Sequence, residues 1–163
     1  GCSRFRSESS PSWISERVCW MTIPNEAEKS GSITVVQRIR STCAVILSGL
    51  IVRLPPRRIK ILLTYLGRGS RPATFQQVSR ARLAACTVSV RCAGMGCVLR
   101  SVAVYLDCRM QGVTPDWCTG FRISPFAAHA WVEAAGVPVD EPAAISSFTT
   151  VIAVRPHSGE SRR

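Results

Sequence analysis

The sequence predicts an α+β fold in which several helices precede an antiparallel sheet. Three observations support this prediction. Residues 33–92 carry apolar side chains at helical spacing, interrupted by prolines and glycines. Another helical pattern begins at Cys97, just after two glycines. From residue 116 onward the apolar residues recur at every second position, which is typical of strands with one buried face.

Three helices are predicted before those glycines. Their ranges are 33–54, 57–66 and 71–92. Pro55 and Pro56 end the first helix and open the second, because proline fits the first turn of a helix but not its interior. Gly67 ends the second helix, and Thr74 is the predicted N-cap of the third.

The fourth helix is predicted to begin at Cys97 and to end at Gly112. Its apolar residues share one face: Val98, Leu99, Val102, Ala103, Leu106 and Met110. A helix N-terminus carries partial positive charge, which favours the reactive thiolate form of a cysteine. Gly94 and Gly96 permit a tight turn or the close approach of a substrate. We therefore predict that Cys97 is a nucleophile. The alternative is a small hydrophobic residue in the core.

The strands are predicted over residues 116–123, 127–134 and 148–156, with a return segment at 137–141. The middle strand alternates, so His129, Trp131 and Glu133 share one face. The only other histidine, His157, lies in a polar tail over residues 157–163 that we expect to be disordered. His129 is therefore the expected general base, and a buried structural histidine is the alternative.

The return segment offers an acid to His129 in either of two registers. A three-residue loop over residues 134–136, with glycine in the left-handed third position, would pair His129 with Glu141. A two-residue loop over residues 135–136 would shift the register by one and bring Asp140 to the face of the histidine. We favour Glu141 and keep Asp140 as the alternative. A thiol, a histidine and an acid would form a catalytic triad.

Composition and charge indicate several classes of function that are not expected of this protein. The formal net charge is +11, but the arginines are scattered instead of clustered with aromatic residues, so a nucleic-acid site is not expected. No signal-peptide pattern opens the chain, and the longest apolar run, residues 43–52, has about half the length of a membrane span. The eight cysteines form no CxxC pair and no zinc spacing. We expect a cytoplasmic protein with reduced thiols, no metal ion and no cofactor.

The predicted organisation has four parts. Residues 1–30 are expected to be a disordered tail or a remnant outside the fold, with Met21 as the natural start. A helical region over residues 31–93 and a catalytic core over residues 94–156 follow, and the C-terminal tail completes the chain.

One stretch carries a family resemblance. Residues 91–142 read RCAGMGCVLRSVAVYLDCRMQGVTPDWCTGFRISPFAAHAWVEAAGVPVDEP. The motifs G-C-x-x-R-S, W-C-x-G-x-R and P-F-A-A-H-A-W-V-E, with 129 − 97 = 32 residues from cysteine to histidine, resemble the leader peptidase of lasso-peptide biosynthesis. This is the transglutaminase-like cysteine protease called the B protein, in the form split from its leader-binding partner. The resemblance is looser from about residue 50, and residues 1–30 are not covered.

The resemblance implies a transglutaminase-like core with a catalytic helix packed on an antiparallel sheet. It implies Cys97 as nucleophile, His129 as base and then acid, and the acid just before Pro142, which is Glu141 with Asp140 still open. The residues expected to contact substrate are Gly96, Phe126 and Trp131. The backbone N–H of Cys97 is the expected oxyanion donor.

The implied substrate is a ribosomally made precursor peptide, and the implied partners are a small leader-binding protein and the ATP-dependent lasso cyclase. The helices of residues 33–90 would dock that partner, cover the sheet, or do both. Two other functions stay open: a transglutaminase-like transfer of the acyl group to an amine, and a non-enzymatic basic helical module for binding or scaffolding.

Overall fold

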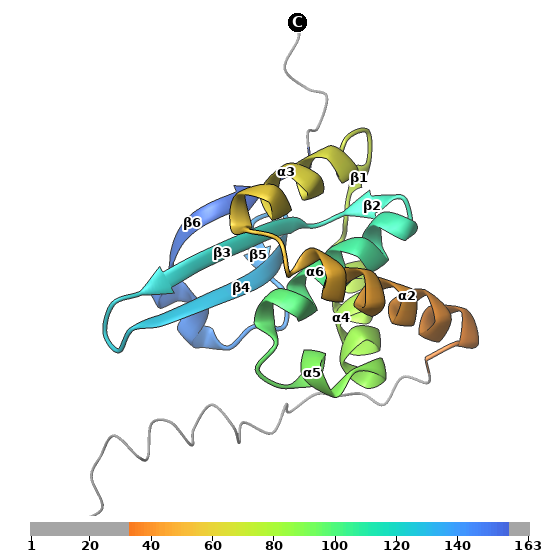
Figure 1. Ribbon diagram of the computed structural model, residues 1–163, viewed down its shortest axis with the longest axis horizontal. Helices are drawn as coiled ribbons and strands as arrows, with labels where there is room; N and C mark the ends of the chain where they lie inside the picture. Colours follow the sequence, from red (N-terminus) through yellow and green to blue (C-terminus); the bar gives the residue numbers. More distant parts are fainter. Residues whose placement is uncertain (1–32, 157–163) are drawn as a thin grey trace, which may run out of the picture. The chain divides into compact units, whose positions relative to one another are not determined.

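The computed structural model describes residues 33–156 and shows an α+β fold, with most helices on one side and an antiparallel sheet on the other (Figure 1). The predicted fold class is confirmed. The predicted tails over residues 1–30 and 157–163 lie outside the described residues. Within the described part of the chain, none of the helices has the length and hydropathy that crossing a membrane requires.

The helical part contains one more helix than predicted. The helices are α2 (Val35–Ile51), α3 (Pro56–Leu66), α4 (Phe75–Val88), α5 (Val90–Ala93) and α6 (Cys97–Met110). Thr74 is the N-cap of α4, as predicted, and its hydroxyl accepts from the Gln77 N–H in a capping box. Thr34 caps α2 in the same way. The extended backbone of Ser89 divides the predicted third helix into α4 and α5.

The sheet has four strands in the order β5-β4-β3-β6, with every neighbouring pair antiparallel. The strands are β3 (Asp116–Arg122), β4 (Ala127–Ala134), β5 (Val137–Pro138) and β6 (Thr149–Val154). A 3-10 helix, η1 (Ala143–Ser147), precedes β6. A separate parallel pair, β1 (Arg71–Pro72) with β2 (Val113–Thr114), was not predicted because each strand has only two residues.

The hairpin between β4 and β5 has a two-residue loop, so the predicted strand pairing of His129 with Glu141 is wrong. Ala134 pairs with Val137, and the loop residues Ala135 and Gly136 both have positive φ, 52° and 77°. This turn follows the right-handed twist of the strands better than the three-residue loop does. Because β5 ends after two residues, the pairing between β4 and β5 does not extend to His129.

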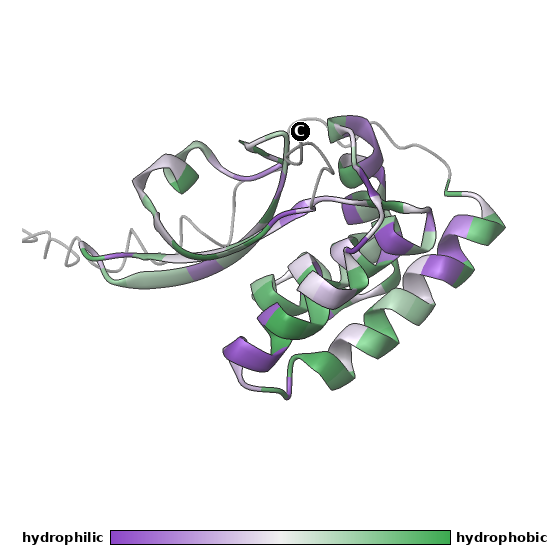
Figure 2. Ribbon diagram, turned by 90° about the horizontal axis from the view of Figure 1, so that it is seen from above, coloured by the Kyte–Doolittle hydropathy of each residue, from purple (hydrophilic) through white to green (hydrophobic). Residues whose placement is uncertain are grey.

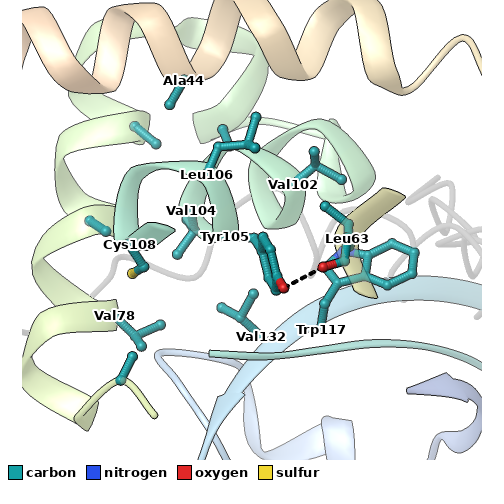
Figure 3. Close-up of a cluster of buried hydrophobic side chains, with 14 of the residues drawn as sticks. Ala44, Leu63, Val78, Val102, Val104, Tyr105, Leu106, Cys108, Trp117 and Val132 are labelled. Carbon is teal, nitrogen blue, oxygen red and sulfur yellow. Dashed lines mark hydrogen bonds between the residues drawn. The ribbon is translucent and has the colours of Figure 1, made fainter. Parts of the chain in front are cut away.

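Helix α6 lies at the centre of the core and is buried on all sides over residues 101–108. This differs from the one-sided apolar face that the sequence predicts. Tyr105 donates its hydroxyl to the carbonyl of Leu63 in α3 (2.7 Å), as Figure 3 shows. On the sheet side, Trp117 donates its indole N–H to the hydroxyl of Ser101 (3.0 Å). Both polar groups are therefore satisfied inside an apolar core.

A buried carboxylate joins α6 to α2. Asp107 is fully buried, and its carboxylate accepts from Arg40 Nε (2.6 Å), the Ser41 hydroxyl and Gln111 Nε2 (3.0 Å). Because a buried charge is costly unless it is paired and hydrogen-bonded, this network fixes how α2 lies against α6.

We predict that Asp107→Asn lowers the free energy of unfolding by about 2–4 kcal/mol, because it leaves Arg40 without its buried anion. Urea denaturation would measure the change. The control is Asp140→Asn, which removes the same charge from an exposed residue and is expected to change stability by less than about 0.5 kcal/mol. Equal effects of the two variants would contradict a structural role for the network.

Candidate active site

Cys97 is the first residue of α6, and a well-supported loop precedes it. Gly96 is the N-cap, and a Cβ there would lie 2.5 Å from the carbonyl oxygen of Arg91, so only glycine fits. Arg100, one turn into α6, donates to the carbonyl of Cys92 (2.9 Å) on the other side of the loop. These contacts hold the thiol in one place at the helix start.

His129 lies on β4 with its ring enclosed by aromatic side chains. Trp131 is nearly parallel to the ring (9°, centroids 6.1 Å apart), and Phe148 lies 5.9 Å away. The indole N–H of Trp131 donates to Glu133 (2.8 Å), which fixes the indole in turn. The Nε2 atom of His129 lies 2.8 Å from Glu141 Oε2. Its Nδ1 is the nitrogen left for the thiol.

The structure brings Glu141, and not Asp140, to His129. The Glu141 side chain is only 1% exposed, whereas Asp140 is exposed. Asp140 has a left-handed backbone (φ 52°), a conformation that aspartate tolerates better than most residues. This turn lies directly beyond Val139, whose N–H makes the last backbone bond to β4. The chain therefore brings the carboxylate to the histidine through a turn and not through strand pairing.

Arg82 is a site residue that sequence reasoning missed. It lies on α4, and its Nη1 donates to Oε1 of Glu141, the oxygen that His129 does not use. Burial alone would raise the pKa of Glu141, but the hydrogen bond to His129 and the charge of Arg82 hold that pKa below its usual value. No local pattern separates Arg82 from the many other arginines, so only the folded chain identifies it.

Cys97 and His129 form a polarised pair. The hydrogen bond with His129 is the largest of the effects that lower the pKa of the Cys97 thiol, and the backbone N–H groups of Ala130 and Val98 add to it. Burial alone would lower the pKa of His129, but its hydrogen bonds with Cys97 and Glu141 outweigh burial and raise that pKa to about 9. The arrangement therefore favours a thiolate beside an imidazolium.

The surroundings of other thiols raise the pKa of the thiol instead of lowering it. Burial raises the pKa of Cys108 and Cys118 to about 12 and also raises the pKa of Cys92. The His, Cys, Asp and Glu side chains of residues 33–156 nowhere form a group of three that could hold a metal ion.

An apolar cavity of about 320 Å³ lies beside Cys97 and His129. Its walls come from α3, the start of α6 and the strands β3, β4 and β6: Pro56, Ile59, Val98, Trp117, Ala128 and Val151. The residues predicted to contact substrate do not line it. Gly96 supports the loop, Trp131 is buried next to the histidine ring, and Phe126 is 77% exposed between β3 and β4.

The expected oxyanion donor is already engaged. The Cys97 N–H donates to the carbonyl of Met95 (3.0 Å). If this N–H stabilised the oxygen of a substrate carbonyl, that oxygen would have to share the N–H with the Met95 carbonyl or displace the Met95 carbonyl from it.

We predict that iodoacetamide modifies Cys97 at pH 6 at least about tenfold faster than the exposed Cys43, because the lowered pKa of Cys97 leaves a larger share of this thiol as the reactive thiolate. Peptide mapping by mass spectrometry would give both rates in one sample. His129→Ala should remove most of the difference. Equal rates in the wild-type protein would mean that the pair is not polarised.

A second prediction concerns Arg82, which acts on the thiol through Glu141 and His129. Arg82→Met should raise the pKa of Glu141, weaken the imidazolium and slow the alkylation of Cys97 at pH 6 by about three- to tenfold. Arg82→Lys should restore much of the rate. Arg80→Met, an exposed position on the same helix, is the control and should leave the rate unchanged. A rate that stays the same in Arg82→Met would contradict this role.

Comparison with known families agrees with this geometry. A family described as the transglutaminase-like superfamily matches residues 42–153, which includes Cys97, His129, Glu141 and Arg82. No curated protein and no solved structure gives a significant match. The match covers more than half of the chain, from within α2 to the end of the sheet. The chain therefore belongs to the transglutaminase-like superfamily.

Proposed function

We propose that the protein is a cysteine peptidase that removes the leader from a ribosomally made lasso-peptide precursor. The observation that carries the peptidase chemistry is the Cys97–His129–Glu141 arrangement at the start of α6. A transglutaminase-like domain is compatible with a cysteine protease or with an acyl transferase. The motifs around Cys97 and His129, which resemble lasso-peptide leader peptidases, support the narrower assignment. The proposal includes a cytoplasmic location and a separate leader-binding partner.

In the first step, the Cys97 thiolate attacks the carbonyl carbon at the junction between leader and core peptide. The C–N bond breaks as His129 gives its Nδ1 proton to the leaving amine, which becomes the N-terminus of the core peptide. The leader stays bound to the Cys97 sulfur as a thioester. The cavity next to the thiol is the natural place for an apolar side chain near the scissile bond.

In the second step, His129, now neutral, takes a proton from water, and the hydroxide attacks the thioester. The C–S bond breaks and returns its electron pair to the Cys97 sulfur, the leader leaves as a carboxylic acid that loses its proton to solvent, and Cys97 and His129 return to their starting charges. Glu141 accepts the hydrogen bond from Nε2 throughout, which fixes the tautomer and stabilises the imidazolium.

The test is to incubate the protein with a precursor peptide from its gene neighbourhood, with and without a leader-binding protein, and to follow the products by mass spectrometry. We expect one cut, at least about a thousandfold slower in Cys97→Ala and about a hundredfold slower in Glu141→Ala. Asp140→Ala, one residue away but exposed, should cut at nearly the wild-type rate. Cleavage that survives Cys97→Ala would overturn the proposal, and products joined to an added amine would indicate acyl transfer instead.

The pH dependence of kcat/KM provides a further prediction. The rate should fall as pH rises through about 9, because His129 then loses the proton that the leaving amine needs. It should also fall at lower pH as the Cys97 thiolate becomes protonated, and the lowered pKa of this thiol extends activity to lower pH than an ordinary thiol would allow. A rate that keeps rising above pH 9 would show that His129 is not the acid.

A further inference from the structure

Helix α2 has a buried face of small residues and an exposed apolar face on the opposite side. Ser41, Ala44 and Ser48 face the core against α6 and α4. The opposite face carries seven apolar residues that are exposed: Val35, Val36, Ile39, Cys43, Ile46, Leu47 and Leu50, here called the α2 stripe. Figure 2 shows α2 at the side of the described domain away from the sheet, with apolar residues along most of the helix.

The α2 stripe is continuous. At 100° per residue its members fill an arc of about 120° without a charged residue. The six largest side chains are between 47% and 74% exposed. Single exposed apolar residues are ordinary on a protein surface, but a contiguous patch of this kind marks an interaction site.

The spacing of the α2 stripe indicates what it binds. Five of its members recur at intervals of three, four, three and four residues: Val36, Ile39, Cys43, Ile46 and Leu50. This is the a/d spacing with which one helix packs against another along a seam. The small Cys43 at the centre leaves room for a large side chain from the partner.

The charges around the α2 stripe indicate whether it binds a helix of another protein or a second copy of this chain. Residues 33–106 contain no Asp or Glu. They contain twelve basic residues: Arg38, Arg40, Arg53, Arg57, Arg58, Lys60, Arg68, Arg71, Arg80, Arg82, Arg91 and Arg100. Arg38 and Arg53 flank the α2 stripe, while Arg40 is paired with Asp107. Two copies facing each other would bring only arginines to the seam, which disfavours self-association.

The composition of the stripe also disfavours a membrane. Helices that lie in a membrane interface commonly carry Trp or Phe on the apolar face and many cations beside it. The α2 stripe has no aromatic residue, and of the three arginines beside it, Arg38, Arg40 and Arg53, one (Arg40) is paired with Asp107. Both features suit a protein helix better than a lipid surface.

We propose that the α2 stripe is the docking face for an amphipathic helix of a partner protein. That helix presents large apolar residues at a/d spacing and Asp or Glu at the positions beside them, which pair with Arg38 and Arg53. The inference rests on the surface of α2 alone and not on the proposed peptidase activity.

The probe is a fluorescein-labelled helical peptide of three heptads, with Leu at a and d and Glu at e and g. Its matched control has Lys in place of every Glu. Fluorescence anisotropy would measure binding to the full chain carrying Cys97→Ala, so that catalysis does not enter. We expect the acidic peptide to bind, the basic peptide to bind at least about tenfold more weakly, and maleimide labelling of Cys43 to slow when the acidic peptide is bound.

Two variants make the test specific. Ile39→Glu with Ile46→Glu places charge inside the α2 stripe and should weaken binding at least about tenfold. Ile61→Glu places the same charge on α3, where Ile61 is 68% exposed, and should leave binding unchanged. Circular dichroism would show that both variants keep the fold.

Three outcomes would overturn the proposal. Equal weakening by Ile61→Glu, or equal binding of the basic peptide, would show that the α2 stripe does not select the helix. A dimer by sedimentation that Ile46→Glu dissociates would identify a second copy as the occupant. Stripe-dependent binding to vesicles of phosphatidylcholine and phosphatidylserine, without binding of the acidic peptide, would identify a membrane.

Discussion

The burial of α6 on every side is the constraint on which the rest of the structure depends. Helices cover one side of it and β4 covers the other, so residues 101–108 are all buried. The N-terminus of the helix is where a cavity opens, and Cys97 occupies that position. A helix held this firmly presents its first residue with little freedom to move, which a positioned nucleophile requires. The same helix therefore forms the centre of the core and carries the candidate nucleophile at its first residue.

Two buried carboxylates connect the layers around α6. Asp107 joins it to α2 through Arg40, and Glu141 joins the segment after β5 to α4 through Arg82. Each carboxylate also accepts from a second group, the Ser41 hydroxyl in one case and His129 in the other. In a chain with few acids and many arginines, a buried anion has no shortage of cationic partners. At Glu141, the interactions that offset the cost of burying the carboxylate also favour the protonated form of His129.

The helical part of the chain contributes to the chemistry as well as to packing. Arg82 comes from α4, while Pro56 and Ile59 bring α3 to the wall of the cavity. The outer face of α2 takes no part in either task, yet it is the most continuous apolar surface of that helix. Within this transglutaminase-like domain, the helices thus divide between completing the site and presenting a separate surface.

Local pattern in the sequence determined the helix that begins at Cys97, the strand that carries His129 and the α+β class, because the spacing of apolar residues and the positions of glycine and proline govern single elements. It also placed Glu141 among the acids near His129, but through a strand pairing that does not exist. Only the tertiary structure decided the two-residue turn, the left-handed Asp140, the approach of Arg82 from α4 and the cavity beside the thiol. The last two features join segments far apart in the chain, and their energies depend on burial and charge that no short stretch of sequence contains.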